Sequence, residues 1–225
     1  MSDNLFTDEN RPLRINDPAP AFTARTTQGV VSLKDYRGRW LILFSHPADF
    51  TPVCTSEFID LENKRAEFEA LNCELLGLSA DSIYSHLAWI TDIQDKFGTT
   101  INFPVIEDLS LIVAEAYGMV DELSSSTATV RSVFFINPEG IIKAMIHYPM
   151  AIGRSVDEIL RVLSALVATE SGNKAAPAGW RPGDDLLLSA PTTVSALRER
   201  LKASQKDRVK SWYYTKEQPN GDSGS

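Results

Sequence analysis

The segment WLILFSHPADFTPVCTSEF, residues 40–58, decides the fold of this chain, because a predicted strand and a predicted helix meet in it. The apolar run at residues 40–46 indicates a buried strand. Thr51 is a favoured N-cap residue and Pro52 is favoured at the first helical position, so we expect a helix to begin there. Cys54, one of only two cysteines in 225 residues, is then the third residue of that helix.

The flanking sequence extends this segment into an α/β pattern. Apolar residues recur at helical spacing from Cys54 to about residue 71, and residues 73–81 form a second apolar strand. A right-handed crossover would make these two strands parallel. Strands at residues 130–136 and 141–148 are joined by the turn sequence NPEG, which predicts an antiparallel hairpin. The remaining elements are predicted helices at residues 82–97, 109–119 and 155–170 and a short strand at 103–108.

The composition changes after residue 170. Residues 171–185 are rich in Gly, Pro and Ala, which is typical of a linker or extended arm, and a short helix is predicted at 193–203. An aromatic cluster follows at residues 212–214. So short a segment cannot bury a core alone, so its apolar residues should pack on the main domain or on a partner chain. We therefore expect a domain at residues 1–170 and a C-terminal extension at 171–225.

The charge and composition of the chain limit the kinds of partner that it is expected to bind. The net charge of −8 argues against nucleic acid, because phosphate binding requires a cationic face. No apolar run approaches the roughly 18 residues of a membrane span, so no membrane association is expected. The polar N-terminal residues do not form a secretory signal, which predicts a cytoplasmic location. Two cysteines make a poor disulfide framework.

The position of Cys54 favours a reactive thiol. In the first helical turn, unpaired N–H groups and the helix dipole both stabilise a thiolate. The dipole contributes only ~0.3 to 1 kcal/mol, whereas lowering a thiol pKa from ~8.5 costs ~1.4 kcal/mol per unit, so a nearby cation is needed. A unit charge at ~4 Å contributes on the order of 4 kcal/mol at a dielectric constant of ~20. Arg131 and Arg154 both lie beside the predicted hairpin, and spacing does not choose between them.

Other interpretations of the cysteines and histidines have to be weighed. A free cysteine is most often a buried, inert side chain, and Cys73 fits that description because it begins an apolar strand, where burial would raise its pKa. Glu57 stands three residues after Cys54, so a C-x-x-C dithiol is absent. The histidines are scattered without the spacing of metal ligands, and no metal or cofactor is predicted. They are His46, His86 and His147.

The cysteine segment resembles the peroxiredoxins. Pro47, Thr51 and Cys54 match their P-x-x-x-T-x-x-C signature, and FSHPADFTPVCTSE resembles the one-cysteine group. The similarity continues in HLAWITDI, VRSVFFINP, YPMAIGRSVDEILRVL and PAGWRPGDD, over nearly the whole chain. It implies a thioredoxin-like fold with a central mixed β-sheet flanked by helices, plus the C-terminal arm.

The resemblance also implies roles for individual residues. Cys54 would be the peroxidatic cysteine, with Arg131 as the arginine beside its sulfur. Thr51 would hydrogen-bond the peroxide, and Pro47 would shield the site from water. A supporting group is implied as well, in which Glu57 and Arg154 orient Arg131 and His46 assists the substrate or the thiolate.

The resemblance further predicts how the sulfur is reduced. The C-terminal resolving cysteine of two-cysteine relatives is replaced here by Ala176, and the resolving position of another branch is Ile59. Reduction is therefore expected from an external thiol, either a small thiol or a redoxin. The arm resembles the extension through which these relatives form homodimers, so a homodimer is expected and larger rings are left open.

The predicted function is a thiol-dependent peroxidase. It would reduce hydrogen peroxide and organic hydroperoxides through a Cys54 thiolate and a sulfenic acid. The alternative is a non-catalytic redox sensor or chaperone-like module, in which oxidation of Cys54 signals to a binding partner. The two hypotheses differ in turnover, since only the peroxidase consumes many equivalents of peroxide.

Overall fold

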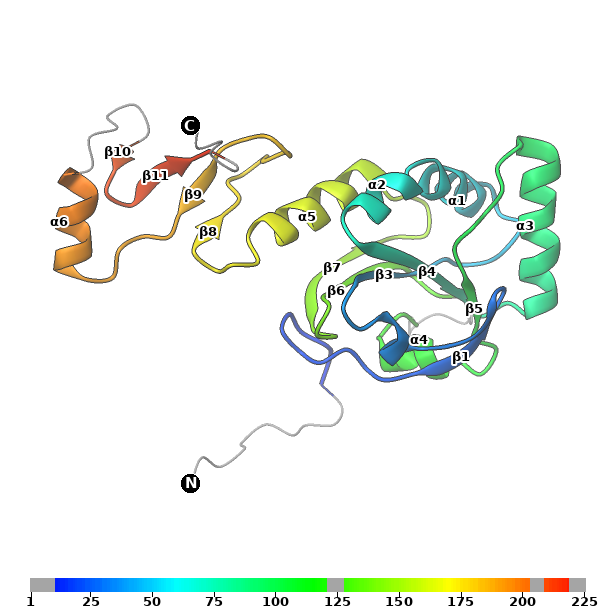
Figure 1. The fold of residues 1–225 in the computed structure, drawn as a ribbon. Coiled ribbons are helices and arrows are strands. Elements are labelled where there is room, and N and C mark those ends of the chain that lie inside the picture. The colour runs from blue at the N-terminus through cyan, green and yellow to red at the C-terminus, as the bar shows by residue number, and fades with distance from the viewer. Residues whose placement is uncertain (1–10, 121–127, 203–208, 219–225) are drawn as a thin grey trace, which may run out of the picture. The chain divides into compact units, whose positions relative to one another are not determined.

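The computed structural model describes residues 11–120, 128–202 and 209–218. The chain falls into two compact units, Met1–Val156 and Asp157–Ser225. Figure 1 shows the large sheet of the first unit and the small sheet of the second. The predicted boundary between residues 170 and 171 stays a prediction, because compactness alone does not say which segment folds independently.

A mixed sheet of seven strands forms the centre of the first unit. The strands are β1 (Thr23–Thr26), β2 (Gly29–Ser32), β3 (Trp40–Ser45), β4 (Cys73–Ser79), β5 (Val105–Glu107), β6 (Arg131–Ile136) and β7 (Ile142–Tyr148). Their order is β2-β1-β5-β4-β3-β6-β7. β3 is parallel to β4 and antiparallel to β6, and β6 is antiparallel to β7. The predicted parallel pair, the hairpin and the mixed α/β fold are therefore confirmed.

Helices cover both faces of this sheet. They are the 3-10 helix η1 (Leu33–Tyr36), α1 (Pro52–Asn63), α2 (Arg65–Ala70), α3 (Ile83–Phe97) and α4 (Ile112–Ala116). Figure 1 shows α1 and α2 on one side of the sheet and α4 on the other. Among the described residues, no helix is both long and apolar enough to cross a bilayer.

β3 is buried along its whole length because both of its faces are covered. Leu41 and Leu43 join a core cluster that includes Val113 of α4. The next side chain in sequence, Phe44, points to the other face, where its ring packs against Phe58 of α1 at a centroid distance of 5.7 Å. Each fully buried side chain of this kind contributes roughly 1.5 to 3 kcal/mol. Double-sided burial explains why this strand is a continuous apolar run.

One predicted helix is wrong in its extent. Residues from Cys54 to about 71 were expected to form a single helix, whereas α1 ends at Asn63 and α2 begins at Arg65. Lys64 between them has φ −105° and ψ 8°, outside the α-helical range. Phe58, Leu61 and Phe68 are nevertheless all buried. The apolar spacing therefore continues through the break, and periodicity alone could not reveal it.

The second unit contains α5 (Val156–Ala168), α6 (Val194–Lys202) and a small antiparallel sheet. α6 agrees with the helix predicted at residues 193–203. The sheet was not predicted, because its strands are too short to show a period-two pattern. Its strands, in the order β10-β11-β9-β8, are β8 (Lys174–Ala175), β9 (Leu186–Leu188), β10 (Val209–Ser211) and β11 (Tyr214–Glu217).

Candidate active site

The first turn of α1 places Cys54 beside the carboxyl end of β3. Thr51 is the N-cap residue, with extended backbone angles of −110° and 146°, and Pro52 starts the helix as expected. The Thr51 hydroxyl differs from expectation, because it donates to the Ala48 carbonyl oxygen at 2.8 Å and does not cap the helix. Cys54 is the third helical residue, and its exposed fraction is 0%.

Arg131 is the cation that contacts this sulfur. Its Nη1 donates to Cys54 Sγ at 3.3 Å, and its Nε donates to the Met150 carbonyl oxygen at 2.9 Å. Arg131 begins β6, which pairs with β3, and this pairing brings the guanidinium to the loop that follows β3. Spacing left Arg131 and Arg154 as alternatives and the family resemblance implied Arg131, and in the structure it is Arg131 that donates to the sulfur.

Glu57 connects the two arginines. It lies one turn after Cys54 on α1, and its Oε2 accepts from Arg131 Nη1 at 2.8 Å. The same oxygen accepts from Arg154 Nη2 at 2.7 Å, while Oε1 accepts from Arg154 Nε at 2.9 Å and from the Arg154 backbone N–H at 2.7 Å. All three side chains are buried, so these charge-assisted bonds are screened little by water. The carboxylate therefore fixes the orientation of both guanidinium groups.

Arg154 also ties this cluster to the sheet. Its Nη1 donates to the carbonyl oxygens of Ser45 at 2.8 Å and Ser132 at 3.0 Å. Ser45 ends β3 and Ser132 lies in β6, so one side chain spans the two strands that position the site. Among the described contacts, Arg154 reaches Glu57, which in turn contacts Arg131.

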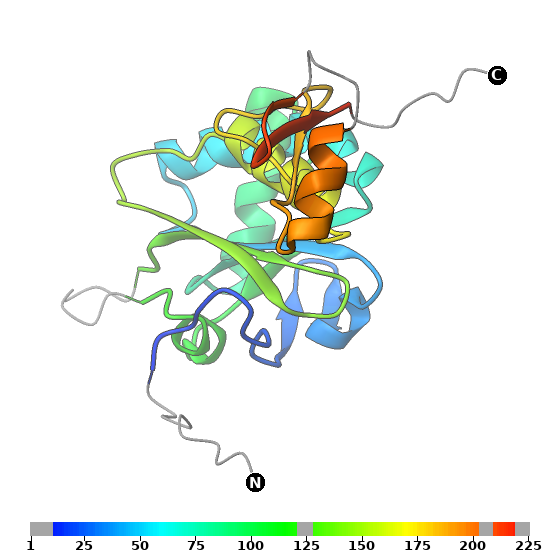
Figure 2. The same cartoon turned by 90° about the vertical axis from the view of Figure 1, so that its left-hand side faces the viewer.

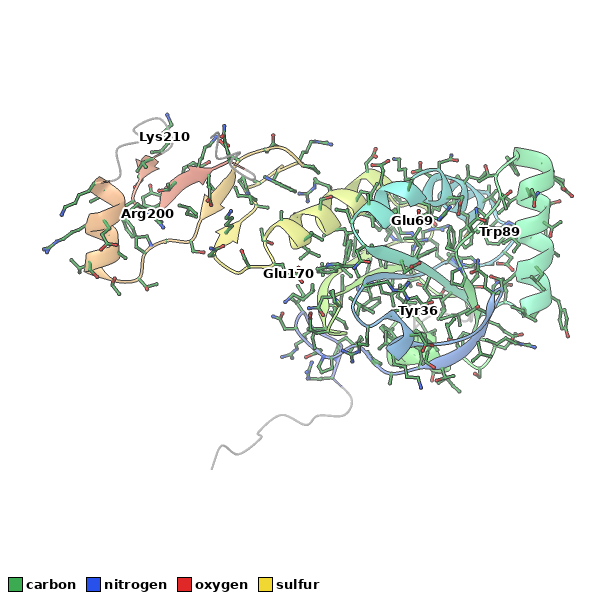
Figure 3. All side chains as sticks on the ribbon, viewed as in Figure 1. Tyr36, Glu69, Trp89, Glu170, Arg200 and Lys210 are labelled. Atoms are coloured by element: carbon green, nitrogen blue, oxygen red, sulfur yellow. The ribbon has the colours of Figure 1, made fainter. Side chains whose placement is uncertain are left out.

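The loop between β3 and α1 contains the other predicted residues. Pro47 is buried and Thr51 is half-buried. Phe50, between them, has φ 55°, in the left-handed region that side chains rarely adopt, and its ring is exposed. A groove of about 580 Å³ between α1 and α3 reaches Thr51 and Pro52 from outside, and Trp89 lines its inner wall. Figure 3 shows Trp89 on the side of α3 that faces the sheet.

His46, for which the resemblance implies a role with the substrate or the thiolate, contacts Asp49 and Trp89 in the structure. Its Nε2 is 2.9 Å from Asp49 Oδ1, and its ring stacks on Trp89 at a centroid distance of 5.1 Å. Burial lowers the pKa of His46 below its ordinary value, against the opposing effect of Asp49, so the ring is neutral at physiological pH.

Sequence reasoning missed Asp49 and His86. The Asp49 carboxyl group lies within hydrogen-bond distance of both rings, with His46 Nε2 at 2.9 Å from Oδ1 and His86 Nδ1 at 2.8 Å from Oδ2. These three residues could offer ligand atoms to a metal, since those atoms lie within 4.8 Å of one another. Hydrogen bonds among the same atoms already account for the grouping. No local signal links Asp49 to His86, because they are 37 residues apart and meet only through the fold.

Cys73 provides the contrast within the same unit. It begins β4, its exposed fraction is 3%, and its Sγ lies 3.5 Å from the Glu74 carbonyl oxygen. Burial raises the pKa of the Cys73 thiol far above its ordinary value, as the sequence predicted. Both cysteines are free.

Comparisons with known proteins agree with this geometry. Residues 15–145 match the AhpC/TSA family, and residues 165–204 match the C-terminal domain of 1-Cys peroxiredoxin. "Peroxiredoxin 2" of Thermoplasma acidophilum is 50% identical over 195 residues, covering 87% of this chain and 96% of the relative. "Peroxiredoxin" of Methanosarcina mazei is 45% identical, covering 88% and 94%. The solved structure of the yeast mitochondrial 1-Cys peroxiredoxin has a TM-score of 0.80 at 38% identity, covering 91% and 100%.

Proposed function

Because the chain belongs to the AhpC/TSA family as a one-cysteine peroxiredoxin, and is therefore a thiol-dependent peroxidase, we propose that Cys54 is its peroxidatic cysteine. The observation that carries this assignment is the N–H of Arg131 that points at Sγ from 3.3 Å. A guanidinium in that position stabilises a thiolate and strengthens the helix-terminus effect. The described hydrogen-bond contacts of Cys73 are with backbone groups of Glu74 and Ile42 and not with an arginine, and burial raises the pKa of its thiol.

The reaction is a displacement at oxygen. The Cys54 thiolate attacks one oxygen of R–O–O–H, the O–O bond breaks, and the product is Cys–S–OH together with an alkoxide or hydroxide that takes up a proton. Sulfur is oxidised by two electrons and the peroxide is reduced by two. Negative charge moves from sulfur to the departing oxygen, so donors fixed around the O–O bond become stronger interactions as the bond breaks.

Three kinds of group near Cys54 would form hydrogen bonds with the peroxide. Arg131 supplies the cationic N–H, and the backbone N–H groups of the first turn of α1 supply neutral ones. The Thr51 hydroxyl already donates to Ala48, so its oxygen is left to accept the O–H of a hydroperoxide. Pro47, buried in the same loop, adds an apolar wall without a backbone N–H. This set suits hydrogen peroxide and small organic hydroperoxides.

We infer that an external thiol reduces the sulfenic acid. Positions Ala176 and Ile59 lack the sulfur that a resolving residue needs, and Cys73 is buried in β4. A thiol that attacks Cys–S–OH releases water and forms a mixed disulfide, and a second thiol then restores Cys54. The yeast mitochondrial relative is described as being resolved through glutathione and thioredoxin systems. For this chain we propose the same two chemical classes, a small thiol or a redoxin.

A homodimer is the assembly we propose. β7 is an edge strand of the large sheet (yellow-green in Figure 2), and such edges pair readily with a second chain. The second unit exposes apolar side chains that a partner would cover. They are Val194, Leu201, Trp212 and Tyr213. Light scattering should give twice the mass of one chain; a mass of one chain would reject the dimer, and a larger multiple would indicate a ring.

A turnover experiment tests the peroxidase proposal. Hydrogen peroxide consumption is followed with dithiothreitol, glutathione or a thioredoxin as the reductant, and a sulfenic-acid trap followed by mass spectrometry locates the oxidised residue. We expect many turnovers and a trapped adduct on Cys54. Oxidation once per chain without turnover would instead favour the redox-sensor alternative, and an adduct on Cys73 would overturn the assignment of Cys54.

A further inference from the structure

Three buried side chains outside the Cys54–Arg131–Glu57 cluster form a hydrogen-bonded chain between the β3–α1 loop and α3: His46, Asp49 and His86. We propose that His86 is a positioning residue for the peroxidase reaction: as a doubly protonated imidazolium it fixes the Asp49 carboxylate, which holds His46 and the backbone leading into Thr51. The inference rests on the proposed roles of Cys54 and Thr51. It extends the site to α3, a helix that contributes no other group to the chemistry.

The charge on His86 follows from its two partners. His86 is fully buried, and its Nε2 lies 3.1 Å from the Ile106 carbonyl oxygen. Its Nδ1 lies 2.8 and 3.1 Å from the two carboxylate oxygens of Asp49. A carbonyl oxygen can only accept, so Nε2 must carry a proton, and an ionised Asp49 also requires a donor at Nδ1. A neutral imidazole has only one N–H, so His86 carries both protons when Asp49 is ionised.

The pKa of Asp49 supports the ionised form of this carboxyl group. Burial favours the neutral acid, but hydrogen bonds from His46 and His86 outweigh it and hold the pKa of Asp49 below its ordinary value. His46 supplies its donor from Nε2 at 2.9 Å. Its Nδ1 is buried without a hydrogen-bond partner among the described residues, so a second proton on that ring would be unsatisfied. The single positive charge of the three residues therefore sits on His86.

Asp49 is also anchored through its backbone. Its N–H donates to Asp81 Oδ2 at 3.0 Å, and the Ser79 hydroxyl donates to the same oxygen at 2.8 Å. The following residue, Phe50, is held in the left-handed region, and Thr51 comes next as the N-cap of α1. A backbone in a conformation that side chains disfavour persists only where its surroundings fix it. Asp49 supplies that constraint through its backbone N–H, which binds Asp81, and through its side chain, which binds His46 and His86.

Loss of the His86 donor would affect the groups that bind the peroxide as well as the surroundings of the thiol. If the donor from His86 is lost, Asp49 becomes a buried anion with one side-chain partner fewer, and the turn at Phe50 can relax. The Thr51 oxygen and the first-turn N–H groups would then move relative to Cys54 Sγ. Small displacements of positioned groups cost large factors in rate. The expected loss is therefore in kcat/KM for peroxide.

The first test is a direct measurement of the protons. Two-dimensional NMR of the full chain, labelled with 15N-histidine and examined near neutral pH, distinguishes an imidazolium from either neutral tautomer. We expect His86 to show two protonated ring nitrogens and His46 to show one, at Nε2. A single protonated nitrogen on His86 would overturn the inference.

The second test is a pair of substitutions that separate the two contacts of His86. His86→Asn keeps an amide donor near the place of Nδ1, facing Asp49, and His86→Gln keeps one near the place of Nε2, facing Ile106. We expect kcat/KM for hydrogen peroxide to fall about tenfold or more in His86→Gln, equivalent to about 1.4 kcal/mol, and only about threefold in His86→Asn. Matched controls are His147→Asn and His147→Gln, on the strand histidine that contacts Ser132.

The outcomes are distinguishable from one another. A histidine with a merely structural role would lower the melting temperature in both variants without a difference in kcat/KM between them, and that result would overturn the inference. If neither variant folds, the NMR measurement on the unchanged protein decides. If the Cys54 assignment itself fails, peroxide consumption survives Cys54→Ser, whereas the protonation of His86 is measured independently of that result.

Discussion

The two cysteines of this chain are almost equally buried and lie in different surroundings. Cys54 and Cys73 are 0% and 3% exposed, so access to solvent does not separate them. Cys54 lies in the first turn of α1 and receives an N–H from Arg131, whereas Cys73 starts a strand and its described hydrogen-bond contacts are with backbone groups, those of Glu74 and Ile42. Burial without a cation raises a thiol pKa, as it does for Cys73. The two cysteines therefore differ not in burial but in the charge that lies beside the sulfur.

The sharpest way to break this comparison is to remove each sulfur in turn. Cys54→Ser should lower the rate of peroxide consumption by at least about a thousandfold, because the nucleophile is lost. Cys73→Ser should keep most of the activity. Both variants are compared in a steady-state assay at equal concentrations of folded protein. If the two results were exchanged, the assignment of the reactive sulfur would be wrong.

The next largest effect is expected from the cation. Arg131→Ala should lower kcat/KM for hydrogen peroxide by about 100- to 1,000-fold, the range found for the loss of one preorganised donor. Alkylation of Cys54 by iodoacetamide at pH 7 should slow as well, because the thiolate loses its partner. Arg65→Ala is the matched control, since Arg65 on α2 contacts only Glu62 and Glu69 through its side chain in the described structure. An unchanged alkylation rate in Arg131→Ala would show that the helix terminus alone activates the sulfur.

A smaller effect is expected at the second arginine. Arg154→Lys keeps the charge but cannot make the planar, multiple contacts to Glu57 and to the carbonyl oxygens of Ser45 and Ser132. The free energy of unfolding should fall by about 2 kcal/mol, measured by urea denaturation. Cys54 should still react faster than Cys73 in the folded variant. Loss of that difference would mean that Arg154 acts on the sulfur and not only on Glu57.

The smallest effect concerns Cys73 and pH. Burial raises the pKa of Cys73 in the folded state, so above pH ~8.5 the unfolded chain loses a proton that the folded chain retains. Stability is therefore highest below that pH and falls as pH rises, by at most about 1.4 kcal/mol per pH unit. Cys54→Ser is compared with the double variant Cys54→Ser and Cys73→Ser, so that one sulfur titrates at a time. Equal slopes between pH 8.5 and 10 would show that Cys73 ionises freely.

Local sequence patterns predicted much of the fold. The strand at β3, the start of α1 at Pro52 and the hairpin of β6 and β7 each depend on neighbouring residues, and each is observed. The break at Lys64 was missed because the apolar spacing runs through it. The four strands of the second unit were missed because each is too short to show a period-two pattern.

Local sequence patterns also predicted part of the candidate active site. Cys54 and the position of Thr51 follow from local helix chemistry. Spacing did not choose between Arg131 and Arg154, whereas the family resemblance implied Arg131, and the pairing of β3 with β6 shows how this residue reaches Cys54 Sγ. Asp49 and His86 could not be found from spacing, since their contact depends on where α3 packs. The same limit applies to the Thr51 hydroxyl, which turns to Ala48 in the folded loop.

The shared carboxylate of Glu57 has a consequence for the oxidised protein. Two guanidinium cations and one carboxylate leave one positive charge in excess, and a thiolate on Cys54 neutralises it. The sulfenic acid is neutral, so oxidation of Cys54 leaves one buried guanidinium charge without a counter-charge. An unpaired charge away from water raises the free energy of the folded protein. The oxidised chain should therefore melt at a lower temperature than the reduced one. Oxidation would therefore loosen the first turn of α1. This loosening would come at the step in which an incoming thiol has to reach the buried sulfur of Cys54.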